Sequence, residues 1–352
     1  MMETIYMDMT EGCDEALMAQ AGEILRRGGL VAFPTETVYG LGGNALDPEA
    51  SAKIYSAKGR PSDNPLIVHI ASFDALPAIV SSMPAEAEKL AKAFWPGPLT
   101  MILPRGERVP LETTGGLDTV AVRMPDNDLA LALIRAGGGY VAGPSANTSG
   151  RPSPTKASHV MEDLGGKIDA VIDGGSTGIG VESTIVDLTE DVPVILRPGY
   201  INMEMLREVI GEVRMDKGLT SDDPSVRPKA PGMKYRHYAP KADMVIVEGK
   251  RENVIRTINR LAAEDIRRGR RVAVLTTDEG AGAYPMGLVV SVGTRKDEIT
   301  IARHLYDSLR YFDKAGVDSV YSEAFDTPQV GGAVMNRLLK AAGHRVIMAD
   351  EE

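Results

Sequence analysis

Residues 28–59 read GGLVAFPTETVYGLGGNALDPEASAKIYSAKG, and this stretch decides the fold class. Its first apolar run, GLVAF, ends at Pro34 and is typical of a β-strand. The later segment has Asp47 to cap a helix, Pro48 at the first helical position and Gly59 at the end. A strand followed closely by a helix predicts an α/β domain.

The rest of residues 1–210 continues this alternation. Short apolar runs bounded by Gly, Pro or Asp predict further strands, and amphipathic segments between some of them predict helices. PLIVHI, TVAVRMP and STIVDL are examples of the strands, and AEAEKLAKAFW and DNDLALALIRAGG of the helices. We therefore predict that residues 1–210 form one domain on a twisted, mixed, open sheet with helices.

Two further segments follow this domain. Residues 211–241 contain many prolines, a tight aromatic and basic cluster (KYRHY) and no apolar period, which predicts an extended linker. A connection of this length without regular structure is often functional. Residues 242–352 alternate strand and helix patterns again, which predicts a smaller, Rossmann-like parallel α/β domain with helices on both faces of its sheet.

Composition and charge exclude several classes of protein. The 352 residues are more than one hydrophobic core usually serves, and the formal net charge of −10 argues against a general nucleic-acid-binding protein. Cys13 is the only cysteine, so an internal disulfide and a cysteine-based zinc site are excluded. Because no apolar run reaches about 18 residues and the N-terminus is acidic, we expect a cytoplasmic protein.

Several familiar nucleotide-binding, metal-binding and catalytic motifs are absent or lack the structural context that they require. GLGGNA at residues 40–45 matches a dinucleotide-binding fingerprint, but the helix signal begins only at Asp47, too late to present its N-terminus to a pyrophosphate. No Gly-Lys-Ser/Thr follows a glycine-rich loop, so a Walker A loop is absent. The five histidines form no metal pair at helical spacing, and no Ser-His-Asp arrangement or pair of carboxylates stands out.

Four regions place hydroxyl or cationic residues beside glycine or proline at the ends of predicted strands. Ligands bind at strand ends in open α/β sheets, although turns also use Gly, Pro and Ser without any function. Lys58, Arg60, Arg123 and Arg197 are the candidates to bind a polyanion such as a nucleoside triphosphate. The regions are FPTETVYGLGGNA (33–45), KGRPSDNPLIVH (58–69), AVRMPDN (121–127) with VAGPSANTSGRPSPT (141–155), and VESTIVDL (181–188) with ILRPGY (195–200).

These regions, together with FWPGPLT, resemble the YrdC/Sua5 family of threonylcarbamoyl-AMP synthases. The resemblance covers essentially the whole chain, and the linker PGMKYRHYAP with a C-terminal α/β domain is similar to the long, two-domain Sua5 form. It implies a nucleotidyltransferase that condenses L-threonine, bicarbonate or carbon dioxide, and ATP into threonylcarbamoyl-AMP and pyrophosphate. The product serves the t6A37 modification of ANN-decoding tRNAs. The resemblance also implies Mg²⁺ with ATP, a downstream Kae1/TsaD-type transferase, a weak contact with tRNA and no membrane.

The resemblance assigns roles to individual residues. The catalytic residues implied are Lys58 and Arg60, which would bind the ATP phosphates. The threonine-binding residues implied are Thr35, Tyr39, His69, Arg123 and Ser183. The ATP-binding residues implied are Lys58, Arg60, Asn64, Thr119, Ser145, Asn147, Arg197 and Tyr235. No protein side chain is assigned as a metal ligand.

Two other functions are weighed against this one. Related domains occur in carbamoyl-transfer enzymes of hydrogenase maturation, but those carry acylphosphatase and zinc-finger modules that a chain with one cysteine does not show. A tRNA-binding or double-stranded RNA-binding module associated with translation is the second alternative. The acidic net charge argues against it, as does the lack of an aromatic and basic strip outside the linker.

Overall fold

The computed structural model describes residues 3–216, 230 and 238–350. The chain divides into two compact units. The second unit contains residues 236–352 and also two short loops, 150–152 and 179–181, while the other residues before 236 form the first. Most of the predicted linker, including Tyr235, lies outside the described residues. Within the described ranges, no helix is long and apolar enough to cross a membrane.

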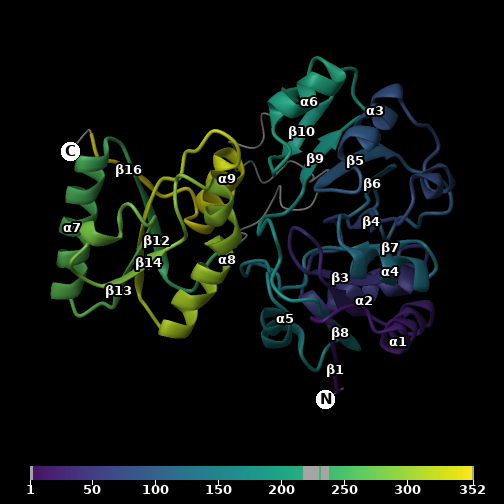
Figure 1. Ribbon diagram of the computed structural model, residues 1–352, viewed down its shortest axis with the longest axis horizontal. Helices are drawn as coiled ribbons and strands as arrows, with labels where there is room; N and C mark the ends of the chain where they lie inside the picture. Colours follow the sequence, from purple (N-terminus) through teal and green to yellow (C-terminus); the bar gives the residue numbers. More distant parts are fainter. Residues whose placement is uncertain (1–2, 217–229, 231–237, 351–352) are drawn as a thin grey trace. The chain divides into compact units, whose positions relative to one another are not determined.

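The first unit is built on an 11-stranded mixed sheet, which confirms the predicted fold class (Figure 1). The strand order is β1-β8-β2-β3-β7-β4-β6-β5-β9-β10-β11. The strands are β1 (Ile5–Asp8), β2 (Val31–Phe33), β3 (Gly40–Asn44), β4 (Ile67–His69), β5 (Leu99–Pro104), β6 (Thr119–Arg123), β7 (Val141–Gly143), β8 (Ala170–Asp173), β9 (Thr184–Asp187), β10 (Val194–Arg197) and β11 (Arg214–Met215). The helices are α1 (Glu15–Arg26), α2 (Pro48–Lys58), α3 (Ala85–Phe94), α4 (Asp128–Ala136), α5 (Ala157–Leu164), α6 (Met203–Ile210) and the 3₁₀ helix η1 (Phe73–Ala78).

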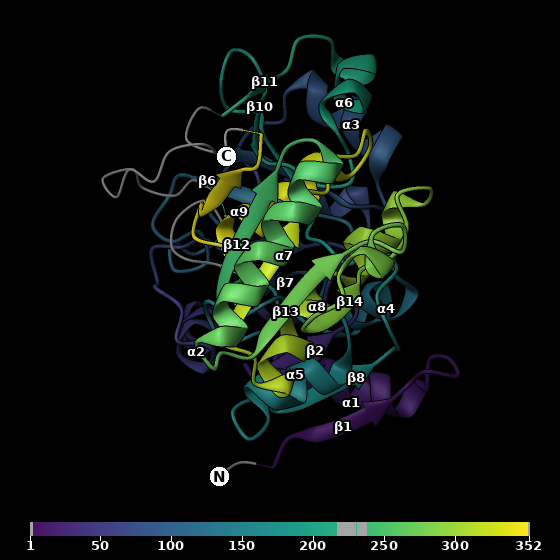
Figure 2. The same cartoon turned by 90° about the vertical axis from the view of Figure 1, so that its left-hand side faces the viewer.

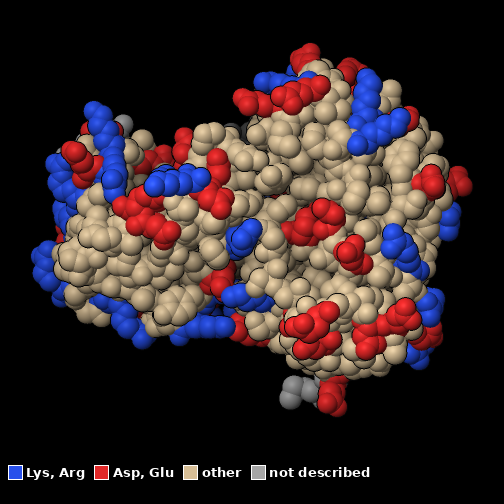
Figure 3. All heavy atoms as spheres, in the orientation of Figure 1, with Lys and Arg blue, Asp and Glu red and all other residues tan. Residues whose placement is uncertain are grey.

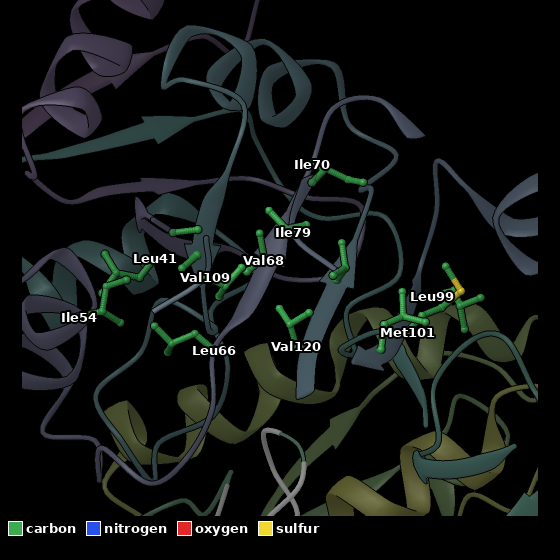
Figure 4. Close-up of a cluster of buried hydrophobic side chains, with 14 of the residues drawn as sticks. Leu41, Ile54, Leu66, Val68, Ile70, Ile79, Leu99, Met101, Val109 and Val120 are labelled. Carbon is green, nitrogen blue, oxygen red and sulfur yellow. The ribbon is translucent and has the colours of Figure 1, made fainter. Parts of the chain in front are cut away.

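The largest hydrophobic core covers one face of this sheet. Alternate residues of a strand point to opposite faces, so Val68 and Val120 enter this core while their neighbours Ile67 and Ala121 do not. Figure 4 shows part of this core, in which Ile54 of α2 lies beside Leu41 of β3. This packed face holds the central strands in a fixed register.

The opposite face of the central strands is covered differently. Helices α1 and α4 pack together, and their apolar residues cover the sheet near β1, β8 and β2. Farther along, over β4, β6, β5, β9 and β10, the buried apolar residues form only a small cluster: Ile67, Ile102, Ala121, Ile185, Leu196 and Ala230. Ala230 comes from the predicted linker and is fully buried there. We call this cluster the apolar floor.

Helix α2 forms as the sequence predicts. The Asp47 side chain accepts a hydrogen bond from the Glu49 amide, Pro48 occupies the first turn, and Gly59 ends the helix in the left-handed conformation at φ 61°. A side chain other than glycine is unfavourable at this φ. The reversal at Gly59 sends the chain from Lys58 directly into the loop that carries Arg60.

The second unit contains a five-stranded parallel sheet in the order β14-β13-β15-β12-β16. Helix α7 packs on one face, as Figure 2 shows, and α8 and α9 lie on the other (Figure 1). The predicted Rossmann-like parallel domain is therefore confirmed. Its elements are β12 (Asp243–Glu248), α7 (Arg251–Arg267), β13 (Val272–Thr276), the 3₁₀ helix η3 (Ala281–Ala283), β14 (Leu288–Ser291), α8 (Glu298–Ala315), β15 (Ser319–Glu323), α9 (Gly331–Ala341) and β16 (Val346–Met348).

Candidate active site

A row of polar side chains crosses the central strands where β4 and β6 end. The parallel pairing of β4 with β6 places His69 beside Arg123, and the antiparallel pairing of β5 with β6 places Thr100 beside Arg123. Ser183, just before β9, has its Oγ 2.8 Å from Thr100 Oγ1. All four side chains are buried. The register thus brings three predicted threonine-binding residues together with Thr100, and we call these four residues the Arg123 group.

Arg123 forms a buried ion pair with Glu36. Its Nη2 lies 2.6 Å from Glu36 Oε2, and the two side chains are only 5% and 13% exposed. Arg123 Nε also donates to the Gly97 carbonyl at 3.4 Å. The second carboxylate oxygen, Glu36 Oε1, is buried without a hydrogen-bond partner among the described residues. Since a buried acceptor is costly to leave unpaired, Glu36 Oε1 is suited to accept a hydrogen bond from a ligand.

His69 is held as a neutral imidazole. Burial, together with the nearby charge of Arg123, lowers the pKa of His69 to about 3. Its Nδ1 lies 3.3 Å from the Val141 carbonyl, and its ring meets Phe33 edge-on with centroids 5.7 Å apart. A carbonyl can only accept, so Nδ1 carries the proton and Nε2 is left as an acceptor. At neutral pH this ring therefore contributes hydrogen bonding rather than charge.

Arg197 supports Ser183 directly. Its Nε donates to the Ser183 carbonyl at 3.0 Å and its Nη2 to Ser183 Oγ at 3.1 Å. The two residues meet because β9 and β10 are antiparallel neighbours. Arg197 is buried, so this double contact holds the Ser183 hydroxyl against Thr100. In this structure Arg197 belongs with the Arg123 group.

Lys58 joins helix α2 to the loop GPSAN. Its ammonium donates hydrogen bonds to the carbonyls of Ser145 and Asn147, and the side chain is almost fully buried. Within the loop, Ser145 Oγ donates to Asn147 Oδ1 at 2.6 Å. Lys58 is therefore one of the residues that shape the loop predicted to bind the adenylate.

Arg60 organises the loop that precedes β4. Its Nε donates to the Asn64 carbonyl at 3.2 Å and its Nη2 to the Pro65 carbonyl at 3.1 Å. Asn64 is buried, and its Oδ1 has no hydrogen-bond partner within the described part of the chain. We call Lys58, Arg60, Asn64, Ser145 and Asn147 the Lys58 group.

The turn FPTETVYG links these two groups. Thr35 Oγ1 donates to the Val38 carbonyl at 2.6 Å and accepts from the Thr37 amide at 3.1 Å, which closes the turn. Tyr39 OH donates to the Gly175 carbonyl at 2.7 Å, and burial together with the charge of Asp173 raises the pKa of this tyrosine. The turn thereby holds Glu36, which reaches Arg123.

The two groups lie at opposite ends of strand β4. Antiparallel pairing of β7 with β4 places Ile67 opposite Gly143, the first residue of the GPSAN segment, whereas His69 is two residues farther along β4. Thr119 begins β6, about 13 Å along the strand from Arg123, and so does not belong to the Arg123 group. The apolar floor lies between the two ends. The site thus has two polar ends and an apolar centre.

Sequence reasoning missed two of these residues. Glu36 lies in FPTETVYG and Thr100 in FWPGPLT, two segments that carry the family resemblance. The resemblance assigns no role to either residue. A glutamate between two threonines at the end of a predicted strand was the signal available in the sequence for Glu36. Across the residues that the structure describes, no group of three His, Cys, Asp or Glu side chains is arranged to hold a metal ion.

Comparison with known proteins decides the family. The family model described as "Telomere recombination" (Sua5_yciO_yrdC) matches residues 23–199, and the model "Threonylcarbamoyl-AMP synthase, C-terminal domain" matches residues 201–343. A threonylcarbamoyl-AMP synthase from Pyrococcus abyssi is 52% identical over 98% of this chain and 99% of its own length. The chain belongs to the Sua5/YrdC family of threonylcarbamoyl-AMP synthases. A relative of the same name from Bacillus subtilis is also 52% identical, over 97% of this chain and 98% of its own length.

Solved structures place the chain within the two-domain branch of the family. The crystal structure of P. abyssi Sua5 complexed with L-threonine is 50% identical, has a TM-score of 0.93, and matches over 98% of this chain and 99% of that one. E. coli YciO, at 27% identity and a TM-score of 0.51, covers 56% of this chain and 95% of its own. The shorter relative thus corresponds to little more than half of the chain, whereas P. abyssi Sua5 corresponds to nearly all of it.

Proposed function

We propose that this threonylcarbamoyl-AMP synthase joins L-threonine, bicarbonate and ATP, releases pyrophosphate, and supplies the product for the t6A modification of tRNA. The observation that carries the proposal is the arrangement of two polar groups on either side of an apolar floor. The Arg123 group offers the charged and hydroxyl groups that could bind a small amino acid. The Lys58 group surrounds the glycine- and proline-rich loops suited to a nucleotide.

The chemistry needs positioning more than proton transfer. The threonine amine adds to carbon dioxide and loses a proton, which gives a carbamate. A carbamate oxygen then attacks the α-phosphorus of ATP, and pyrophosphate leaves with the electrons of the broken P–O bond. Because the carbamate is already an anion, no strong general base is required, and the enzyme must mainly hold two anions in line. A neutral His69 is compatible with such a site.

At the amino-acid end, we assign the threonine contacts to the residues around Arg123. The guanidinium and the Ser183 hydroxyl are suited to bind the substrate carboxylate, while His69 Nε2 and the unpaired Glu36 Oε1 are acceptors for substrate N–H or O–H groups. Thr35 and Tyr39 act from the adjoining turn. Support comes from P. abyssi Sua5, which has been crystallised with L-threonine.

At the nucleotide end, we assign ATP binding to the Lys58 group with Thr119 and Tyr235. Arg197, the other residue predicted to bind ATP, lies with the Arg123 group, where it holds Ser183. Lys58 and Arg60 donate to backbone carbonyls of the loops that would surround the nucleotide. We expect their charges to stabilise the triphosphate as well, so each of these two cations has both a structural and an electrostatic role. The linker that would bring Tyr235 to the site includes Ala230, which is buried on the apolar floor.

Magnesium is expected to enter with ATP. Mg²⁺ retains several waters and commonly binds substrate phosphates with only one or two carboxylates from the protein. When bound, the ion would neutralise charge on the triphosphate. Removal of Mg²⁺ with EDTA should therefore abolish pyrophosphate release without unfolding the protein.

The product and the charge of the protein suggest its partners. Threonylcarbamoyl-AMP is a mixed anhydride prone to hydrolysis, so a Kae1/TsaD-type transferase in the cytoplasm is expected to consume it promptly. On the face drawn in Figure 3, acidic and basic side chains are interspersed, consistent with a net charge of −10 and with only weak tRNA contact.

The decisive experiment measures pyrophosphate release from ATP. We expect release only when L-threonine and bicarbonate are both present, together with formation of threonylcarbamoyl-AMP. Release that is independent of threonine would contradict the proposal. A protein that ignores threonine but binds tRNA with a steep salt dependence would instead be an RNA-binding module.

A further inference from the structure

The second unit contains a cavity of about 690 Å³ at the carboxyl ends of its parallel strands. After β12, the chain forms β13 and β14 on one side of β12 within the sheet. After β15, it forms β16 on the other side of β12. The cavity lies where β12 and β15 are neighbours and this direction reverses, a common ligand-binding position in open α/β sheets. Its volume is within the range typical of small-molecule sites. None of its lining residues comes from the motifs assigned to threonylcarbamoyl-AMP synthesis.

The floor of the cavity is a hydrogen-bond and ion-pair network around the buried carboxylate of Glu323. Glu323 Oε1 accepts hydrogen bonds from Thr276 Oγ1 and from Tyr284 OH, both at 2.7 Å, while Arg295 Nη2 lies 3.1 Å from Glu323 Oε2. Gly280 leaves room for this carboxylate, because a Cβ at that position would lie only 2.5 Å from Glu323 Oε1. This network fixes the floor of the cavity, and both oxygens of the Glu323 carboxylate already have partners.

Two carboxylates and one hydroxyl in the lining of the cavity have no hydrogen-bond partner in the part of the chain that the structure describes. Within the described residues, the side chains of Glu248 and Asp326 form no hydrogen bond or ion pair. The Thr277 hydroxyl is fully buried and has no partner of good hydrogen-bond geometry, although it lies close enough to Glu279 to help lower its pKa. A hydrogen bond from Thr294 contributes most to lowering the pKa of Glu279, to about 2, so this carboxylate stays charged.

The charge balance defines the chemical class of the ligand. The lining contains two arginines and four carboxylates, a formal net charge of −2, which disfavours phosphates. The carboxylates are not grouped as metal ligands anywhere in the described chain. Val254, Met335 and Leu339 supply apolar wall. We propose that this cavity binds a small organic molecule that carries one or more primary ammonium groups on an aliphatic portion.

Polyamines and basic amino acids share this chemistry, so both are used as probes. Calorimetric titration of the full chain with spermidine, and separately with L-lysine, should show saturable one-to-one binding of at least one of them. Binding of spermidine alone would indicate a polyamine site, and binding of L-lysine alone an amino-acid site. Absence of saturable binding by both probes would overturn the proposal.

Matched variants test whether binding occurs in the cavity. The double variant E248Q/D326N should weaken binding at least ~10-fold, because each change removes an unpaired carboxylate without changing shape. Glu252 is exposed on helix α7 and does not line the cavity, so E252Q, which also removes a charge, should bind like the parent. Both variants should retain threonine-dependent pyrophosphate release, which verifies folding. Equal affinity in the parent and the double variant would show binding elsewhere and refute the assignment.

Discussion

At the scale of single residues, the Arg123–Glu36 ion pair illustrates how the site combines stability with function. The two charged residues are 87 positions apart in the sequence, and their side chains are largely buried where they meet. Burying charges is costly, and only close pairing with further hydrogen bonds offsets that cost. Arg123 is tied to Glu36 and to the Gly97 carbonyl, so it is already oriented before any substrate arrives.

The change Glu36→Gln tests this pair. It keeps the shape of the side chain but leaves the Arg123 guanidinium buried without a counter-charge, which should cost about 3 kcal/mol of unfolding free energy. The KM for L-threonine should also rise, because Arg123 loses its orientation. Urea unfolding and threonine-dependent kinetics measure the two effects. Glu88→Gln, which removes an exposed partner of Lys92, is the control and should leave both the unfolding free energy and the KM nearly unchanged. Similar behaviour of the two variants would contradict the role assigned to the Arg123–Glu36 pair.

The buried His69 makes stability depend on pH. Its folded pKa of about 3 is below the ordinary value of 6.5, so the fold favours the neutral ring. The stabilisation is present above pH 6.5 and is lost as the pH falls from there toward 3, because the unfolded chain binds the proton first. His69→Asn removes this titration while an amide N–H can still reach the Val141 carbonyl.

Between pH 8 and pH 5, the parent should therefore lose about 2 kcal/mol more unfolding free energy than His69→Asn. Denaturant unfolding at a series of pH values measures the difference. His344→Asn, at an exposed position, is the matched control. Parallel pH profiles for the parent and His69→Asn would mean that the ring is not held neutral by the fold.

At the scale of elements, the hairpin of β9 and β10 is closely packed where it approaches Ser183. A Cβ on Gly199 would lie 2.4 Å from the Thr184 amide nitrogen and 2.7 Å from Thr184 Oγ1. The Thr184 hydroxyl in turn donates to the Ile201 carbonyl at 2.6 Å, which closes the hairpin end next to Ser183. Only glycine allows this approach.

Gly199→Ala should consequently destabilise the protein by about 2 kcal/mol, since backbone atoms must move to admit the methyl group. Displacement of Ser183 should also lower the rate of pyrophosphate release at least ~10-fold. Thermal unfolding and steady-state kinetics provide the two readouts. Gly282→Ala is the control, because no heavy atom lies within 4 Å of the added Cβ. If both glycine variants behaved like the parent, the close packing at Gly199 would have no functional consequence.

The sequence predicts elements better than it predicts partners. Helix α2 is predicted because Asp47, Pro48 and Gly59 are local signals that act within one turn of their own positions. The carbonyls that receive the Lys58 ammonium belong to Ser145 and Asn147, and a carbonyl carries no signature of residue type. The sequence therefore shows that position 58 is a cation, but it does not predict which groups the Lys58 ammonium contacts.

Two features of the fold escape prediction for a similar reason. Strand β11 has only two residues, both exposed, so no apolar alternation marks it. Pairing of Arg214 and Met215 with β10 nevertheless extends the sheet beyond the predicted boundary at residue 210. The loops 150–152 and 179–181 belong to the second unit through contacts distant in sequence, which local patterns do not encode.

At the scale of the whole molecule, the loops 150–152 and 179–181 group with the second unit although each interrupts the chain of the first. The Gly150 carbonyl accepts a hydrogen bond from the Ala239 amide, and the Pro152 carbonyl accepts one from Arg310 Nη2 at 2.6 Å. Loop 150–152 follows the GPSAN segment closely, and loop 179–181 directly precedes Glu182 and Ser183. The two loops that group with the second unit are therefore neighbours, along the chain, of segments from both ends of the candidate site.

Removal of the second unit should leave a folded but weakly active protein. A chain ending at residue 216 retains every strand of the 11-stranded sheet. A chain ending at residue 210 lacks β11 and should be less stable than the 1–216 fragment. In both fragments the loops 150–152 and 179–181 lose their partners, so pyrophosphate release should fall at least ~10-fold below that of the full chain. Circular dichroism melting curves and kinetics on all three chains make the comparison. Full activity in the 1–216 fragment would show that the active-site loops order themselves without the second unit.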